Sequence, residues 1–443
     1  MKLDLFTVDQ SVARAHAVIG RALAKLPDTD PTDDIREVAS QATYKALVEL
    51  DISPAMVLHR DALVRWVHEL LQARVAWPLL VDEAEAIDLV DPVVGRPGSV
   101  PIAKTWREAL ANLTGSPNVD EADRALNRLD AMALPVAAVR KELRARRFEA
   151  ARRLGYPHPW AQANELAALA RSILDATDAL STQLVRDLRK RNESEIESAA
   201  LVIDDAFGRA AREGWPAQLT GRWYEDVFRA IAPRAPRSVE LPAATSGASF
   251  LRGAYAWGMA LRFASTARSL PFALSRDPQP IHAHTFGALL AIAVADRVFA
   301  KKKLEIPVRG ADAHARFLGR VLFFGLRRAA VDVLLGIPET VSPSDVEELS
   351  SRLYGAALSP NIGSAWVFGG FAGKVRIDAP SRLVGALRGH ALAATLVERY
   401  DEDWFANPRA GAHLASIGAG PIWDGDPLPE TSPVVRAFEE SLG

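Results

Sequence analysis

The chain has 443 residues, no cysteine and nearly balanced charge, with 53 basic against 55 acidic side chains and a formal net charge of -2. The lack of cysteine excludes disulfide bonds and thiolate-bound metal or iron–sulfur sites, and it is typical of a reducing compartment. The balanced charge excludes a strong overall attraction to nucleic acid or to an anionic membrane surface. We therefore expect a cytoplasmic protein that binds no nucleic acid and recognises any partner through a local surface.

The sequence predicts neither a signal peptide nor a membrane span. Residues 1–10 contain acidic side chains and no apolar run. The longest apolar stretch, residues 288–295, is far shorter than the roughly 20 residues that a transmembrane helix needs. We expect this stretch to be a buried helix.

Near the start of the chain, three stretches carry apolar residues at three- and four-residue spacing, the pattern of amphipathic helices. We expect these helices over residues 10–25, 33–50 and 59–77. The prolines that separate them are Pro27, Pro31, Pro54 and Pro78.

The Pro- and Gly-rich segment DPVVGRPGSVP, residues 91–101, is a poor interior for a helix or strand. It predicts a boundary between a helical N-terminal lobe, residues 1–100, and a helical body, residues 101–443. The Pro-rich residues 233–245 mark a possible second boundary inside the body.

A run of seven basic residues follows in the chain. They are Arg140, Lys141, Arg144, Arg146, Arg147, Arg152 and Arg153. A nucleic-acid-binding helix uses such a stripe against phosphates, but two glutamates interrupt it and the whole chain is not basic. We expect a solvated helix face, with a face that binds anions or peptide carboxylates as the alternative.

The rest of the sequence continues with helical periodicity. The helices that it predicts cover residues 161–191, 193–212, 221–232, 249–267, 311–335, 342–353 and 379–400, followed by one from 408 and a short one ending at 442. Ser342 and Asp345 have the spacing of a capping box. Because no stretch alternates polar and apolar residues, we predict an all-α fold.

The functional hypothesis centres on residues 270–300, LPFALSRDPQPIHAHTFGALLAIAVADRVFA, in which residues 284–288 read His-Thr-Phe-Gly-Ala. Zinc peptidases built on long helices carry H-E-x-x-H at such a place. Their two imidazoles bind zinc from one helix face, and the glutamate is the general base. Thr285 cannot take a proton from water at neutral pH, and Ala288 has no lone pair. The sequence therefore predicts that ordinary zinc hydrolysis cannot occur here.

Around this motif, over about residues 155–408, the chain resembles the oligoendopeptidase F and thimet-oligopeptidase type of zinc metallopeptidase. Long helices precede the motif, residues 391–408 resemble the C-terminal helix pair of that group, and the glycine-rich residues 369–373 resemble the loop that lines their substrate cleft. The resemblance implies a two-lobed, clam- or saddle-shaped helical body with a central cleft.

The resemblance also implies a glutamate downstream as third zinc ligand, and tyrosines beside the glycine-rich loop. Here Asp312 and His314 stand on the corresponding helix, and Phe371 and Lys374 stand near the loop. We interpret the chain as a degenerate, non-catalytic member of this type, a pseudoenzyme that needs no cofactor.

Two nonstandard metal sites are weaker alternatives. His282, His284 and His314 would hold zinc or nickel if the backbone brought their imidazoles together, but residues two apart point to different sides of a helix. Residues 68–72, His-Glu-Leu-Leu-Gln, match H-E-x-x-H except at the last place, where glutamine is a poor zinc ligand. For the first site, we favour histidines that are structural or that line the cleft. For the second site, we favour a surface or inter-lobe contact.

The leading hypothesis is a peptidase-like protein that holds an extended peptide or a partner protein segment in its cleft, through main-chain hydrogen bonds and apolar pockets. The residues expected at the wall of that cleft are His284, Thr285, Arg316, Arg320, Gly370 and Lys374. The basic groups would meet acidic side chains or a C-terminal carboxylate. A divergent metallohydrolase with a nonstandard histidine site and an architectural helical interaction protein are the open alternatives.

Overall fold

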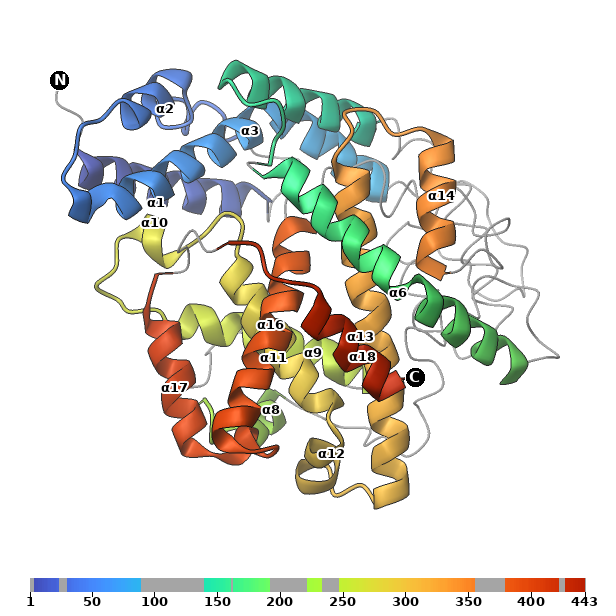
Figure 1. Cartoon of the computed structure of the whole chain (residues 1–443). Helices are drawn as coiled ribbons and strands as arrows, with labels where there is room; N and C mark the ends of the chain where they lie inside the picture. The colour runs from blue at the N-terminus through green and yellow to red at the C-terminus, as the bar shows by residue number, and fades with distance from the viewer. Residues whose placement is uncertain are drawn as a thin grey trace, which may run out of the picture.

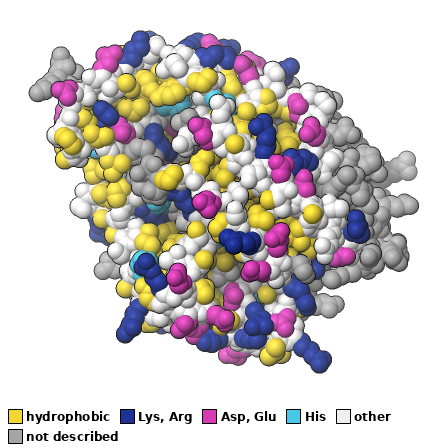
Figure 2. All heavy atoms as spheres, viewed as in Figure 1, with side chains coloured by type: hydrophobic (Ala, Val, Ile, Leu, Met, Phe, Trp, Pro, Cys, Tyr) yellow, Lys and Arg dark blue, Asp and Glu magenta, His cyan; other side chains and the backbone are white. Residues whose placement is uncertain are grey.

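A computed structural model of the chain describes residues 4–23, 30–88, 139–160, 162–191, 221–232, 247–354, 379–421 and 427–442. Within these ranges every regular element is a helix, so the predicted all-α class is confirmed (Figure 1). Figure 2 shows acidic and basic side chains interspersed over the visible face. No single helix in the described ranges is long and apolar enough to cross a membrane, although one pair of helices bent by 72°, residues 281–295 and 297–303, has the length and composition to do so.

The helices of the N-terminal lobe pack around a core of their own (Figure 1). They are α1 (Leu5–Leu23), α2 (Gln41–Val48), the 3-10 turn η1 (Pro54–Met56) and α3 (Val57–Asp88). The same core takes in Ala273 and Leu274 from the short helix α10 (Phe272–Ser275), which lies just before the central helix of the body. The lobe is therefore packed directly against the segment that leads into the central helix.

Two helix boundaries in this lobe differ from the prediction. Residues 32–38 form turns, and α2 starts only at Gln41, because Ser40 Oγ accepts a hydrogen bond from the Thr43 N–H at 3.1 Å and caps the helix there. Pro78 lies inside α3 and does not end it. Trp77 beside it is buried, and we attribute the continued helix to packing that outweighs the lost backbone hydrogen bond.

The body consists of a helix over residues 139–153 and a series of named helices. In chain order these are α6 (Ala163–Arg191), α8 (Gly221–Phe228), α9 (Gly247–Ser265), α10, α11 (Ile281–Ala295), α12 (Arg297–Lys303), α13 (Val308–Gly336), α14 (Pro343–Tyr354), α16 (Ala379–Tyr400), the 3-10 turn η5 (Trp404–Ala406), α17 (Pro408–Ala419) and α18 (Ser432–Leu442).

These helices build two cores that share α13 and α16. The first core lies among α6, α13, α14, α16 and α18, and the second among α8, α9, α11, α12, α13, α16, η5 and α17. The first half of α16 packs into the first core through Leu383 and Leu387, and its second half packs into the second core through Ala393 and Leu396. One straight helix thus ties both halves of the body together.

The central helix of the body is α11, and all but three of its residues are buried. It lies between α9 and α16, the two helices with which it makes its most extensive contacts (Figure 1). A helix that is apolar on every side is stable only where it is surrounded by protein. The prediction of a buried helix over residues 288–295 is therefore confirmed.

The basic run is only partly a solvated face. Arg140, Arg144 and Arg147 share one side of the helix over residues 139–153 and are buried, whereas the other four basic side chains are exposed. Arg144 donates a hydrogen bond to the Leu335 carbonyl near the end of α13, and Arg147 faces the carboxylate of Glu69 on α3. The expected solvated face is present only at those four side chains, because Arg144 and Arg147 interact with groups of neighbouring helices.

Candidate functional site

The motif residues His284 and Thr285 lie in the first turns of α11, which begins directly after Pro280. His284 is buried, with 4% of its surface exposed, and a hydrogen bond of 2.6 Å joins its Nδ1 to the Oη of Tyr255 on α9. The Thr285 hydroxyl donates to the Ile281 carbonyl at 2.9 Å, so it bonds within its own helix. Neither side chain is arranged as a general base toward a solvent-filled site.

Two glycines of α16 lie against the face of α11 that carries His284 and Ala288. A Cβ atom added at Gly385 would be 2.4 Å from the Cβ of His284, and one added at Gly389 would be 2.6 Å from the Cβ of Ala288. Both distances are shorter than real Cβ contacts, so only glycine fits at these positions of α16. The backbones of the two helices are therefore in direct contact along residues 284–288.

The opposite side of α11 is equally close to α9. A Cβ atom at Gly258 would be 2.4 Å from the Phe286 carbonyl oxygen, and one at Gly287 would be 2.9 Å from the Tyr255 carbonyl oxygen. The central helix is thus held between two helices at backbone distance. An imidazole at position 288 has no space in this arrangement, since Ala288 is 5% exposed and its methyl group already touches α16.

The three histidines considered for a metal site lie apart. His314 Nε2 hydrogen-bonds to the Val294 carbonyl at 2.9 Å, near the last turn of α11, and burial lowers the pKa of this imidazole. Val294 is ten residues after His284, which corresponds to about 15 Å along a helix. The structure does not bring the three imidazoles together, and the described ranges contain no group of three or more potential ligands close enough to hold a metal ion.

Two of the other residues expected at the cleft wall are on α13. Arg316 and Arg320 are one turn apart on α13, with Arg316 exposed and Arg320 half-buried. Gly370 and Lys374 lie outside the described residues, as does the whole glycine-rich segment.

The second motif, His68-Glu69-x-x-Gln72, forms a contact between lobe and body. Gln72 Nε2 lies 3.2 Å from His68 Nδ1 and donates to the Pro159 carbonyl at 3.3 Å. Glu69 accepts a hydrogen bond of 3.2 Å from Gln279, just before α11. Burial lowers the pKa of His68 to about 4 and raises that of Glu69. These groups join α3 to the segments that precede α6 and α11.

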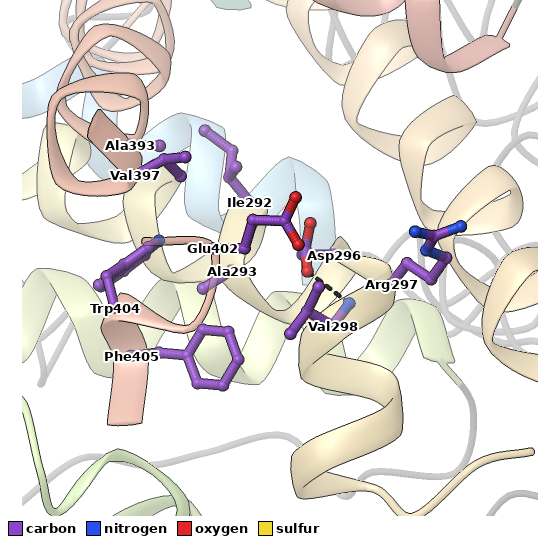
Figure 3. Close-up of a pocket in the computed structure, with 10 residues that line it drawn as sticks. All are labelled: Ile292, Ala293, Asp296, Arg297, Val298, Ala393, Val397, Glu402, Trp404 and Phe405. Atoms are coloured by element: carbon purple, nitrogen blue, oxygen red, sulfur yellow. Dashed lines mark hydrogen bonds between the residues drawn. The ribbon is translucent and has the colours of Figure 1, made fainter. Parts of the chain in front are cut away.

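A pocket of about 290 Å³ opens at the carboxyl end of α11 (Figure 3). It lies between the α11–α12 junction on one side and α16 with η5 on the other. Ten side chains line it: Ile292, Ala293, Asp296, Arg297, Val298, Ala393, Val397, Glu402, Trp404 and Phe405.

The sequence analysis did not predict this pocket. It also did not predict that α16 covers the face of α11 that carries residues 284 and 288. The covering of this face had a signal in the sequence, namely the Gly385-x-x-x-Gly389 spacing, which places two small residues on one helix face. The pocket had none, because Asp296 and Glu402 become neighbours only through the packing of α11 against α16.

No protein-family model and no curated protein sequence matches this chain. Among solved structures, it is similar to that of PZ peptidase A with inhibitor 2, with a TM-score of 0.52 and 11% sequence identity over 90% of this chain and 83% of that one. A second structure, of the Pyrococcus furiosus carboxypeptidase, gives a TM-score of 0.44 at 12% identity over 99% of both chains. The first of these similarities shows that the chain has a helical, peptidase-like fold.

Proposed function

We propose that this chain is a non-catalytic protein of the oligoendopeptidase F and thimet-oligopeptidase type, with a degenerate zinc motif, which holds an extended peptide or a segment of a partner protein. The observation that carries the proposal is the contact between Ala288 and Gly389, where helix packing occupies the place of the second zinc-binding imidazole. Thr285, which occupies the place of the catalytic glutamate, is bonded back to its own helix.

Hydrolysis by the zinc mechanism requires three protein ligands, a bound water and a base within reach of that water. His284 is the only motif ligand left, and its Nδ1 is engaged by Tyr255. Restoring the lost groups would require α11 and α16 to separate, since the face that carries positions 284 and 288 is covered by the backbone of α16.

Peptide binding does not need these groups. A peptidase framework holds an extended chain through main-chain hydrogen bonds and side-chain pockets, and neither depends on a metal. The fold likeness to PZ peptidase A, whose structure contains an inhibitor, and the apolar pocket beside η5 both support retention of binding.

The metal part of the proposal is tested by elemental analysis of the full chain after dialysis against zinc. We expect that the protein does not bind one equivalent of zinc. We also expect the same metal content in the protein and in its His284→Ala variant. One equivalent of zinc that disappears in His284→Ala, together with peptide hydrolysis, would identify a metallohydrolase and overturn the proposal.

The binding part is tested by calorimetry or fluorescence anisotropy with pooled decapeptides of random sequence. We expect at least one pool to bind with micromolar affinity and to be recovered uncleaved. The absence of any micromolar binder would favour an architectural helical protein. In that case a subunit interface above about 1,000 Å² is the feature to look for in solution.

A further inference from the structure

The pocket beside η5 has a composition that selects one kind of side chain. We propose that it binds the lysine or arginine side chain of the segment that this protein holds. The inference rests on the proposed function and adds to it the chemical class of one recognised residue and the place where that residue lies.

The walls of the pocket are mainly apolar. Trp404 and Phe405 of η5 are buried and form its inner side, while Ile292 of α11 lies across from them (Figure 3). Val397 of α16 also lines the pocket and is 41% exposed, which is unusual for a large apolar side chain in the described part of this protein. The methylene stem of a lysine or arginine buries well against such a wall while its charged head stays polar.

The polar part of the pocket is negative. The carboxylates of Asp296 and Glu402 come from opposite sides of the pocket and lie near each other (Figure 3). Arg297 also lines the pocket, but its side chain extends away from the two carboxylates (Figure 3) and lies 3.6 Å from Asp312.

The backbone holds the carboxylate of Asp296 and sets where Glu402 leaves the main chain. Asp296 Oδ1 accepts hydrogen bonds from the N–H groups of Val298 at 2.6 Å and Phe299 at 3.2 Å, which fixes it as the N-cap of α12. Asp401 has φ of 68°, a left-handed conformation that turns the chain out of α16 immediately before Glu402. The Asp296 carboxylate is thus in place before a ligand arrives, which reduces the entropy lost on binding.

The electrostatics favour a cation over other occupants. Desolvation raises the pKa of Asp296, and the charge of Glu402 raises it further. The two negative charges repel each other, and a positive group beside them would reduce this repulsion. An acidic or C-terminal carboxylate group would be repelled. The volume of about 290 Å³ and the apolar walls suit an organic side chain better than a bare metal ion, for which the described residues supply no set of three ligands.

The experiment compares four pools of decapeptides with randomised flanks and one fixed central residue, which is lysine, arginine, norleucine or glutamate. Binding to the full-length protein is measured by fluorescence anisotropy. We expect the lysine and arginine pools to bind at least tenfold more tightly than the norleucine pool, a difference of about 1.4 kcal/mol. The glutamate pool should bind most weakly.

Variants assign that preference to the pocket. Glu402→Gln and Asp296→Asn keep the side-chain shape, and asparagine keeps the cap of α12, so each should remove most of the tenfold preference without weakening the norleucine pool. Asp403→Asn is the matched control, because Asp403 pairs with Lys302 and does not line the pocket. This variant should leave the preference unchanged.

The outcomes separate the two proposals. Equal binding of the lysine, arginine and norleucine pools would overturn the pocket assignment while leaving peptide binding intact, as would an equal effect of Asp403→Asn and Glu402→Gln. If no pool binds, saturation-transfer NMR with Nα-acetyl-lysine methylamide tests the pocket alone. A signal from this probe that is lost in Glu402→Gln would support the pocket even though peptide binding had failed, and no signal would reject both.

Discussion

The substitution Gly389→Ala tests whether α16 closes over the motif face of α11. In an exposed helix position, replacing glycine by alanine stabilises a protein by up to about 1 kcal/mol, because alanine restricts the unfolded chain. At position 389 the new methyl group would lie 2.6 Å from the Cβ of Ala288, and 3.1 Å from both the Leu289 nitrogen and the Thr285 carbonyl oxygen.

Carbon atoms in contact prefer about 3.5–4.0 Å, so the two helices would have to separate by roughly 1 Å near this point. Such overpacking costs about 1–3 kcal/mol, which exceeds the propensity gain. We therefore expect Gly389→Ala to lower the free energy of unfolding by about 1–2 kcal/mol.

A matched control exists on α13. Gly325 is a helix glycine for which an added Cβ would meet nothing within 4 Å. Gly325→Ala should therefore stabilise the protein by up to about 1 kcal/mol, opposite in sign to the effect at position 389. The double variant Ala288→Gly/Gly389→Ala removes the atom that clashes, and it should show a favourable coupling of about 1 kcal/mol or more relative to the two single variants.

The assay is urea unfolding followed by tryptophan fluorescence and far-ultraviolet circular dichroism, with unfolding midpoints compared at constant slope. If Gly389→Ala were as stable as the unmodified protein, or shifted in the same direction as Gly325→Ala, the helices would not be in contact at this face. The proposal that helix packing occupies the place of the second zinc-binding imidazole would then be refuted.

Three further predictions concern buried polar groups. Tyr255→Phe removes the hydrogen bond to the buried imidazole of the motif, and should lower the free energy of unfolding by about 1–2 kcal/mol in the same urea assay; an unchanged midpoint would count against that bond. Burial raises the pKa of Asp277 to about 6, so the native protein binds a proton here more tightly than the unfolded chain, and this stabilisation is present at low pH and is lost as the pH rises through 6. Asp277→Asn should therefore gain up to about 3 kcal/mol in stability relative to the unmodified protein between pH 4 and pH 8, and a difference independent of pH would refute the assignment. Asp178→Asn takes the charged partner from Arg327, which is 0% exposed, and should lower the thermal midpoint by several degrees, whereas Asp226→Asn breaks an exposed pair and should leave it unchanged.

Local chemistry in the sequence was sufficient to predict the long helices α9, α13 and α16. The spacing of apolar residues gave the bounds of α16 as residues 379–400, and those of α9 and α13 to within a few residues. The capping box at the start of α14 is present, since Asp345 Oδ2 accepts from the Ser342 N–H at 2.8 Å and Ser342 Oγ accepts from the Asp345 N–H at 3.2 Å. These features depend on residues within one or two helical turns of each other, so the amino-acid sequence alone is enough to identify them.

The tertiary structure determined which residues of different helices come into contact. The sequence alone determined that position 285 carries no carboxylate and position 288 no imidazole, whatever the fold. Only the packing of α16 on α11 determined that the motif face is covered, and only the meeting of the α11–α12 junction with η5 placed Asp296 opposite Glu402. Contacts of this kind join residues remote in sequence, and they depend on how rigid helices fit together, which the periodicity of any single helix does not specify.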